Sequence, residues 1–137
     1  MVVSIMPTVF EKLNLKDQKE LVVLNAPPSF QPELESLVGV KILTTLDVAT
    51  QVDFFLAFVT LKNDVDAISK IVAQKARGDA VVWFAYPKGT SKKYQCDFNR
   101  DNGWNVIYDL GFQPVRMVAI DEDWSALRMR KSEYVKK

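Results

Sequence analysis

The sequence predicts a three-layer α/β fold, in which helices cover both faces of a mostly parallel, twisted sheet and the C-terminal strand runs antiparallel. Three observations lead to this fold. Strongly apolar runs that do not alternate with polar residues indicate strands buried on both faces. Helical segments separate those runs, and only three residues join the last two runs. We treat residues 1–137 as a single α/β domain, because 137 residues is an ordinary length for one domain.

Four apolar runs and one weaker run predict five strands before the C-terminal one. Two of them, VDFFLAFVT and AVVWFAY, are continuous, as expected for strands covered on both faces. Another run contains Pro114 near its start, where a missing amide is tolerated. The expected strands are Glu20–Asn25, Val40–Thr44, Val52–Thr60, Ala80–Tyr86 and Phe112–Ile120.

Helical segments alternate with these strands, which favours right-handed βα units and a parallel sheet. The longest places Val65, Ile68, Val72 and Ala76 on one face, and Gly78 follows it as the expected C-terminal cap. Asn99 is an expected N-cap for a later helix, which Gly111 would close. The expected helices are Pro7–Leu13, Pro32–Leu37, Lys62–Arg77 and the segment between Asn99 and Gly111.

The end of the chain breaks this alternation. The sixth strand, Trp124–Lys131, follows Ile120 after Asp121-Glu122-Asp123. Three residues are too few for a parallel crossover connection. The last strand is therefore expected to return antiparallel, and we expect it to lie between Ala80–Tyr86 and Phe112–Ile120.

Composition narrows the classes of function. The net charge of +1 gives no reason to expect a nucleic-acid partner. Cys96 is the single cysteine and there is no histidine, so an internal disulfide, the usual zinc sites and histidine-based triads are excluded; we expect no metal site. Met1–Phe10 does not have the pattern of a signal peptide, and no apolar run approaches the ~20 residues of a membrane-spanning helix. A cytoplasmic location is the resulting expectation.

A doubly wound sheet closed by an antiparallel strand resembles the class I methyltransferase-like fold. Asp79–Pro87 resembles the strand that, in those enzymes, follows a helix ending in a glycine turn. Phe112–Lys131 would match their final hairpin, whose second strand inserts between its neighbours. More specifically, Asn25–Pro28, Tyr86–Lys88 and Asp121–Arg128 resemble a bacterial family that is catalogued as a domain of unknown function. This resemblance implies a Rossmann-like fold and candidate positions, but it assigns no reaction and no cofactor.

The loop after the first strand departs from active methyltransferases, in which a glycine-rich turn lets the backbone approach the cofactor. Here Pro27 and Pro28 remove two amide donors and fix φ. The carboxylate expected after the second strand is replaced by Thr44 and Thr45, and Asp47 is a poor substitute. We therefore expect a domain that is not an active methyltransferase and that does not bind adenosylmethionine.

Three unusual loops are expected at the carboxyl edge of the sheet, where ligands bind in open α/β folds. They follow the first, fourth and fifth strands in the chain. The loop that begins at Pro87 carries three lysines, two hydroxyls and a glycine, and a helix start with Arg100 nearby would favour a phosphate or carboxylate. A solvated, lysine-rich surface loop is the competing interpretation. The candidate ligand-binding residues are Asn25, Lys88, Ser91, Lys92, Arg100, Asp121 and Trp124.

The sequence leaves the function unknown and three hypotheses open. The first is a binding domain for a small anionic or nucleotide-like ligand. The second is a divergent transferase in which Lys88, Tyr94 or Asp121 acts as acid or base. The third is a protein-interaction module, such as a homodimer, whose pocket is filled by Phe30, Tyr94 or Trp124. For Trp124 itself, packing is the favoured interpretation. For Arg128, on an interior strand, we expect a structural ion pair.

Overall fold

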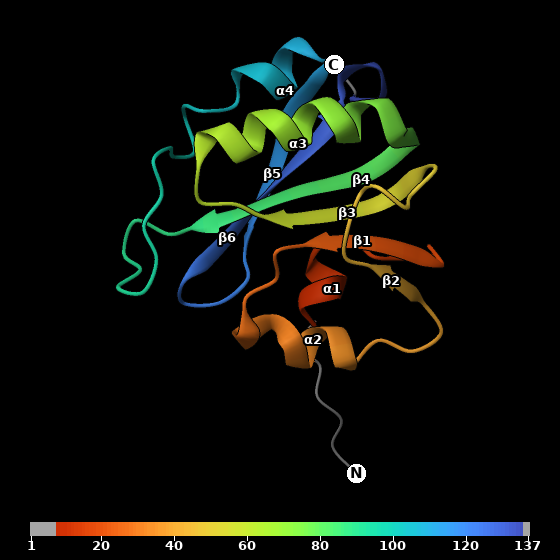
Figure 1. Ribbon diagram of the computed structural model, residues 1–137, viewed down its shortest axis with the longest axis horizontal. Coiled ribbons are helices and arrows are strands. Elements are labelled where there is room, and N and C mark those ends of the chain that lie inside the picture. Colours follow the sequence, from red (N-terminus) through yellow and green to blue (C-terminus); the bar gives the residue numbers. More distant parts are fainter. Residues whose placement is uncertain (1–7, 136–137) are drawn as a thin grey trace.

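The computed structural model describes residues 8–135, and its centre is one twisted six-stranded sheet (Figure 1). The strand order is β2-β1-β3-β4-β6-β5. The first four strands in this order run parallel, and β6 is antiparallel to both of its neighbours. The strands are β1 (Glu20–Leu24), β2 (Lys41–Leu43), β3 (Val52–Phe58), β4 (Ala76–Pro87), β5 (Phe112–Ala119) and β6 (Trp124–Lys131).

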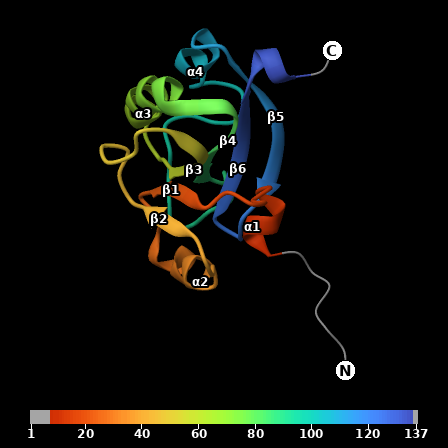
Figure 2. The ribbon, with the colours of Figure 1, turned by 90° about the vertical axis from the view of Figure 1, so that its right-hand side faces the viewer.

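Helices cover both faces of the sheet, which confirms the expected three-layer α/β fold (Figures 1 and 2). On one face lie α3 (Lys62–Lys75) and α4 (Asn105–Asp109), and on the other lie α1 (Val9–Lys12) and α2 (Gln31–Glu35). Single 3₁₀ turns at Pro28–Phe30 and Ser132–Tyr134 precede α2 and follow β6. The connection from β1 leads to one side of the sheet and that from β3 to the other, so the point of reversal lies between these two strands.

The apolar runs are buried on both faces because successive side chains of a strand point to opposite sides. Phe55 and Phe84 belong to the core beneath α3 and α4, whereas Phe54 and Trp83 belong to the core beneath α1 and α2. All four side chains are fully buried. Full burial of one such side chain stabilises the fold by roughly 1.5–3 kcal/mol, so the two cores fix β3 and β4 as the centre of the molecule.

The position of the last strand confirms the prediction from the three-residue turn. Trp83 of β4 lies opposite Arg128 of β6, and Arg116 of β5 lies opposite the same residue from the other side. Strand β6 is thus inserted between β4 and β5 and antiparallel to both, as in the methyltransferase-like fold. The insertion places the β5–β6 hairpin next to the end of β4.

Two expected helix boundaries are wrong. Helix α3 ends at Lys75 and the chain enters β4 at once, so Gly78 does not cap the helix but adopts a φ of 56° in the irregular first part of β4. The helix expected from Asn99 begins only at Asn105. Helix α1 begins at a capping box of Thr8 and Glu11, and its expected start at Pro7 lies outside the described residues.

Candidate functional site

Two of the three loops at the carboxyl edge are joined by direct hydrogen bonds. The Lys88 amide, just after β4, donates to the Asp123 carbonyl at 2.8 Å, and the Ser91 hydroxyl donates to the Asp123 carboxylate at 2.9 Å. The rings of Tyr94 and Trp124 lie 4.8 Å apart. These contacts hold residues 88–94 against the β5–β6 hairpin, and they separate two hollows at this edge.

The first hollow, which we call the switch-point crevice, lies outside the ends of β1 and β3 and measures about 380 Å³. Aromatic rings fill the space beneath it. The centre of the Phe58 ring lies 4.9 Å from that of Phe30 and 5.1 Å from that of Trp124. Trp124 is 3% exposed, and its Nε1 has no partner among the described residues. The lining residues are Asn25, Pro27, Pro28, Phe58, Thr60, Asp64, Tyr94 and Trp124.

The backbone of this crevice offers few donors to a ligand. Pro27 and Pro28 carry no amide hydrogen. Asn25 adopts a φ of 59°, and its side-chain amide donates to the Phe58 carbonyl at 3.5 Å, at the long limit of a hydrogen bond. Asp47 is exposed after β2 and does not line the crevice. The only carboxylate among the lining residues of the crevice is that of Asp64 in α3.

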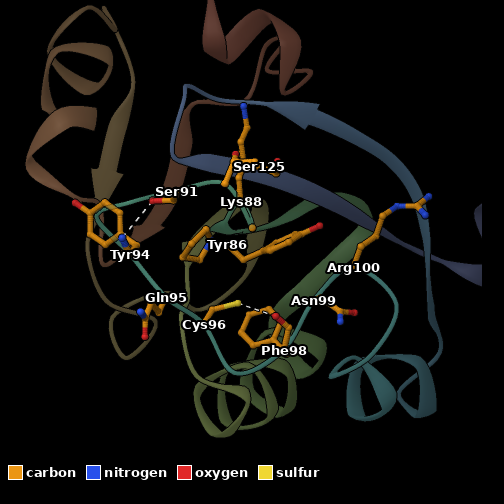
Figure 3. A pocket seen from close by; sticks show the side chains of 13 residues that line it. Tyr86, Lys88, Ser91, Tyr94, Gln95, Cys96, Phe98, Asn99, Arg100 and Ser125 are labelled. Atoms are coloured by element: carbon orange, nitrogen blue, oxygen red, sulfur yellow. Dashed lines mark hydrogen bonds between the residues drawn. The ribbon is translucent and has the colours of Figure 1, made fainter.

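The second hollow, which we call the loop pocket, measures about 720 Å³ and opens between the loop after β4 and the start of β6 (Figure 3). Its lining includes two positively charged side chains, Lys88 and Arg100, and no carboxylate. The lining residues are Tyr86, Pro87, Lys88, Gly89, Thr90, Ser91, Tyr94, Gln95, Cys96, Phe98, Asn99, Arg100 and Ser125.

The two cations of the loop pocket do not converge on one point. In Figure 3, the side chains of Lys88 and Arg100 extend in different directions, with Tyr86 between them. Lys88 is half-buried and Arg100 is exposed, with one loose ion pair to Asp101 at 3.8 Å. Burial raises the pKa of the Tyr86 hydroxyl, and the nearby charge of Arg100 opposes this effect. A ligand that contacted both cations would therefore have to be extended.

Several polar groups of the pocket are already bonded within the loop. Besides donating to Asp123, the Ser91 oxygen accepts from the amides of Lys93 and Tyr94, at 3.3 and 3.1 Å. The Cys96 thiol donates to the Phe98 carbonyl at 2.7 Å. Ser91 therefore shapes the wall of the pocket as an organiser of the turn.

The seven candidate residues divide into three groups. Lys88, Ser91 and Arg100 line the loop pocket, and Asn25 and Trp124 line the switch-point crevice. The other two, Lys92 and Asp121, line neither hollow.

Asp121 has a structural position in the hairpin. Its Oδ1 atom accepts from the amides of Asp123 and Trp124, at 2.8 and 2.9 Å, and so closes the turn between β5 and β6. Of the residues considered as acid or base, Lys88 and Tyr94 line the loop pocket and Asp121 does not.

The expected contribution of a helix start to an anion site is wrong. The Asn99 carboxamide oxygen accepts from the amides of Asp101 and Asn102, at 2.8 and 3.1 Å, and so caps a turn of the loop. Helix α4 has only five residues, and Trp104 at its N-cap makes no side-chain cap. An anion in the loop pocket would therefore gain nothing from the amides or the dipole of a helix start.

Sequence reasoning missed Tyr86, Gln95 and Ser125 as lining residues. For Ser125 a signal exists: along a strand it faces the side opposite to Trp124, and it is the one small hydroxyl in the run WSALRM. Gln95 lies in a loop without periodicity, so no pattern marks it. Among residues 8–135, no group of three or more histidine, cysteine or carboxylate side chains is arranged to hold a metal. Within the same range, no helix has the length and apolar character needed to cross a membrane.

Several solved structures that are similar to this chain are methyltransferases. A SAM-dependent methyltransferase from Aquifex aeolicus superposes with a TM-score of 0.61 at 10% identity, over 90% of this chain and 87% of the other. The ribosomal protein L11 methylase of Lactobacillus delbrueckii subsp. bulgaricus superposes with a TM-score of 0.55 at 11% identity, over 90% of this chain and 77% of the other. Magnesium protoporphyrin IX methyltransferase of Synechocystis PCC 6803, with bound SAM, superposes with a TM-score of 0.55 at 11% identity, over 90% of this chain and 74% of the other.

These likenesses establish the fold as methyltransferase-like. No family model matches the sequence, and no curated protein matches it. At about one identical residue in ten, the superpositions carry the order and direction of the strands but not the chemistry of a site.

Proposed function

We propose that this chain is a binding domain for a small, extended anionic ligand, such as a nucleotide-like phosphate, and that the ligand occupies the loop pocket. The observation that carries the proposal is the lining of that pocket, which has two cations and no carboxylate. Its volume of about 720 Å³ lies in the range of roughly 300–1,000 Å³ typical of small-molecule sites. Tyr86, Tyr94 and Phe98 add aromatic surface for a planar group.

The switch-point crevice gives the complementary support. The residues there do not fit adenosylmethionine, because two prolines replace the turn that would donate amides to it. Aromatic side chains occupy the space beneath the crevice, and no carboxylate from the end of β2 reaches it. We therefore propose that this chain does not act as an adenosylmethionine-dependent methyltransferase. The narrower resemblance to a bacterial family without an assigned activity stays a prediction.

Calorimetry with a matched set of ligands tests this proposal. Adenosine phosphates should bind, adenosine should bind at least about tenfold more weakly, and adenosylmethionine should show no dissociation constant at or below about 10 μM, which corresponds to about −7 kcal/mol. Added salt should weaken the binding of the adenosine phosphates, because exposed charges are screened over about 8 Å at physiological ionic strength. Equal binding of adenosine and its phosphates would contradict the anion site.

Two lysines of the same loop provide the matched variants. Lys88 is half-buried and lines the pocket, whereas Lys93 is exposed and lines neither hollow. Lys88→Ala should make the binding free energy of the phosphate ligand less favourable by about 1.5–3 kcal/mol, the contribution of one hydrogen bond to a charged group. Lys93→Ala should leave it nearly unchanged. If the two variants behave alike, the loop is only a solvated, lysine-rich segment.

The filled crevice also favours a second candidate, a protein-interaction module that keeps the fold without the cofactor. Phe30 and Trp124 are buried, and the Tyr94 ring packs against Trp124 at an angle of 50°, which is the arrangement expected for a filled pocket. Light scattering across a concentration series tests the homodimer form of this idea. A monomer at every concentration, together with phosphate binding in the loop pocket, would decide for the small-molecule function.

A further inference from the structure

A second cationic cluster lies on the opposite face of the sheet from the loop pocket. Arg128 is in β6, Arg116 lies directly opposite it on β5, and Arg130 follows two residues further along β6. Since side chains two residues apart share one face of a strand, and directly paired residues do so too, all three project from the same face. We call this cluster the arginine face.

The face is the one that carries α1, as the neighbour of Arg128 on β4 shows. That neighbour is Trp83, whose indole nitrogen donates to the Leu13 carbonyl at the end of α1, at 2.7 Å. Further along, Lys12 of α1 donates to the Ala119 carbonyl, at the far end of β5. Ser125 of the loop pocket points to the other side of β6, so the two cationic sites are separated by the sheet.

Only one carboxylate serves these three guanidinium groups among the described residues. Asp79 accepts from Arg130 through both oxygens, at 2.9 and 2.6 Å, in a bidentate pair. Arg128 and Arg116 form no ion pair within residues 8–135. Three positive charges and one negative charge leave an excess of two.

The expected ion pair of Arg128 is therefore wrong, and its guanidinium is poorly satisfied. The Nε atom is buried without a hydrogen-bond partner among the described residues. Burial lowers the pKa of Arg128 and the charge of Arg130 adds to this effect, whereas Asp79 acts in the opposite direction. Like charges on directly opposite residues of a sheet also disfavour folding. Stability alone does not explain why two arginines face each other here.

We propose that the arginine face binds a phosphoryl dianion, as inorganic phosphate or on a small phosphate ester, between Arg116 and Arg128. Two guanidinium forks that form no ion pair within residues 8–135 match the oxygens of such a group, and two excess positive charges match its charge. Arg116 is exposed on β5, so the ligand reaches the site from solvent. This proposal is independent of the function proposed for the loop pocket, because it uses other residues on the other face.

Inorganic phosphate is the probe, with ionic strength held constant by sodium chloride. We expect phosphate to raise the melting temperature and to shift the Nε–H resonance of Arg128 in ¹⁵N NMR spectra, since a ligand of the native state stabilises it. Arg116→Gln and Arg128→Gln should each weaken phosphate binding about tenfold or more. Acetate, a monoanion, should bind more weakly than phosphate.

Two control variants keep the test specific. Arg77→Gln removes an exposed arginine that is paired with Asp53, and Arg100→Gln removes one from the loop pocket. Both should retain the Arg128 resonance shift. The proposal is overturned if Arg116→Gln binds phosphate as the natural sequence does, if Arg100→Gln abolishes the shift, or if acetate equals phosphate. Should Arg128→Gln not fold, the exposed Arg116 variant decides.

Discussion

The switch-point crevice and the loop pocket lie side by side at the carboxyl edge of the sheet and share Tyr94, but their linings differ in kind. Around the crevice, a chain of rings from Phe30 through Phe58 and Trp124 to Tyr94 continues the core to the surface. The loop pocket is walled by a long loop that contains polar and cationic side chains. At the position that a doubly wound fold offers to a ligand, aromatic packing thus leaves the smaller hollow, and the larger hollow lies one strand further along.

The contrast between the switch-point crevice and the loop pocket predicts its largest effect on stability for Trp124→Ala. Removal of this buried side chain should destabilise the protein by about 3–5 kcal/mol, the usual cost of a large aromatic-to-alanine change in a core. Gln95→Ala in the loop pocket should cost less than about 0.5 kcal/mol, because its exposed side chain makes no core contact. Urea unfolding measures both.

Trp124→Phe is the matched control for this pair. It keeps an aromatic ring in the core but removes the indole nitrogen, which has no hydrogen-bond partner in the described part of the chain. We expect it to recover most of the stability lost in Trp124→Ala. If Trp124→Ala costs no more than Gln95→Ala, then the crevice is not part of the core and the contrast between the two hollows fails.

An intermediate effect is expected at two glycines of the loop after β4. Gly103 has a φ of 101°, and a Cβ atom there would lie 2.6 Å from the Cβ atom of Phe98, which forms part of the pocket wall. Gly103→Ala should therefore destabilise the protein by about 1–3 kcal/mol and should weaken any ligand of the loop pocket. Gly89 has open space around it and no positive φ, so Gly89→Ala should be nearly neutral.

Thermal unfolding and the calorimetric titration measure this pair. The result sharpens the comparison, because it separates the part of the pocket wall that packs against Phe98 from the glycine that has open space around it. Equal stability of the two variants would show that Phe98 can move aside, and that the wall near Trp104 is not fixed. The ring centres of Phe98 and Trp104 lie 5.2 Å apart, so we expect Phe98 to stay in place when a Cβ atom is added at Gly103.

The sequence predicted the sheet well, because its evidence is local and strong. Continuous apolar runs such as Phe54–Phe58 identify buried strands, and the three-residue turn before Trp124 forces an antiparallel return. Helix ends were less predictable. Asn99 has the right side chain for an N-cap, but the same carboxamide caps a turn of the loop, and the helix starts after Gly103.

The sites could be predicted only in part, since they depend on which partners meet across strands. The charges of Arg128 and Arg130 both lower the pKa of Asp79, but nothing in the chain order says that Arg130 takes both of its oxygens. Likewise, three lysines in one loop are equivalent by composition. Only the fold half-buries Lys88 against the hairpin and leaves Lys92 and Lys93 in solvent.

The smallest predicted effect concerns alkaline pH and compares a tyrosine of the loop pocket with one outside it. Burial raises the pKa of Tyr86 above its usual 10.0. The unfolded chain then loses this proton first as pH rises, so the folded state loses stability above about pH 10 and keeps the full contribution below it. Tyr86→Phe should reduce this alkaline loss, which urea unfolding at pH 8 to 11 measures. Tyr108, whose pKa is also raised by burial, lies outside both hollows, and Tyr108→Phe provides the comparison. A phosphate ligand bound beside Arg100 should change the alkaline response of both tyrosines, because it offsets the Arg100 charge that lowers the pKa of each. If the ligand leaves the alkaline response of both tyrosines unchanged, the anion does not bind beside Arg100 in the loop pocket.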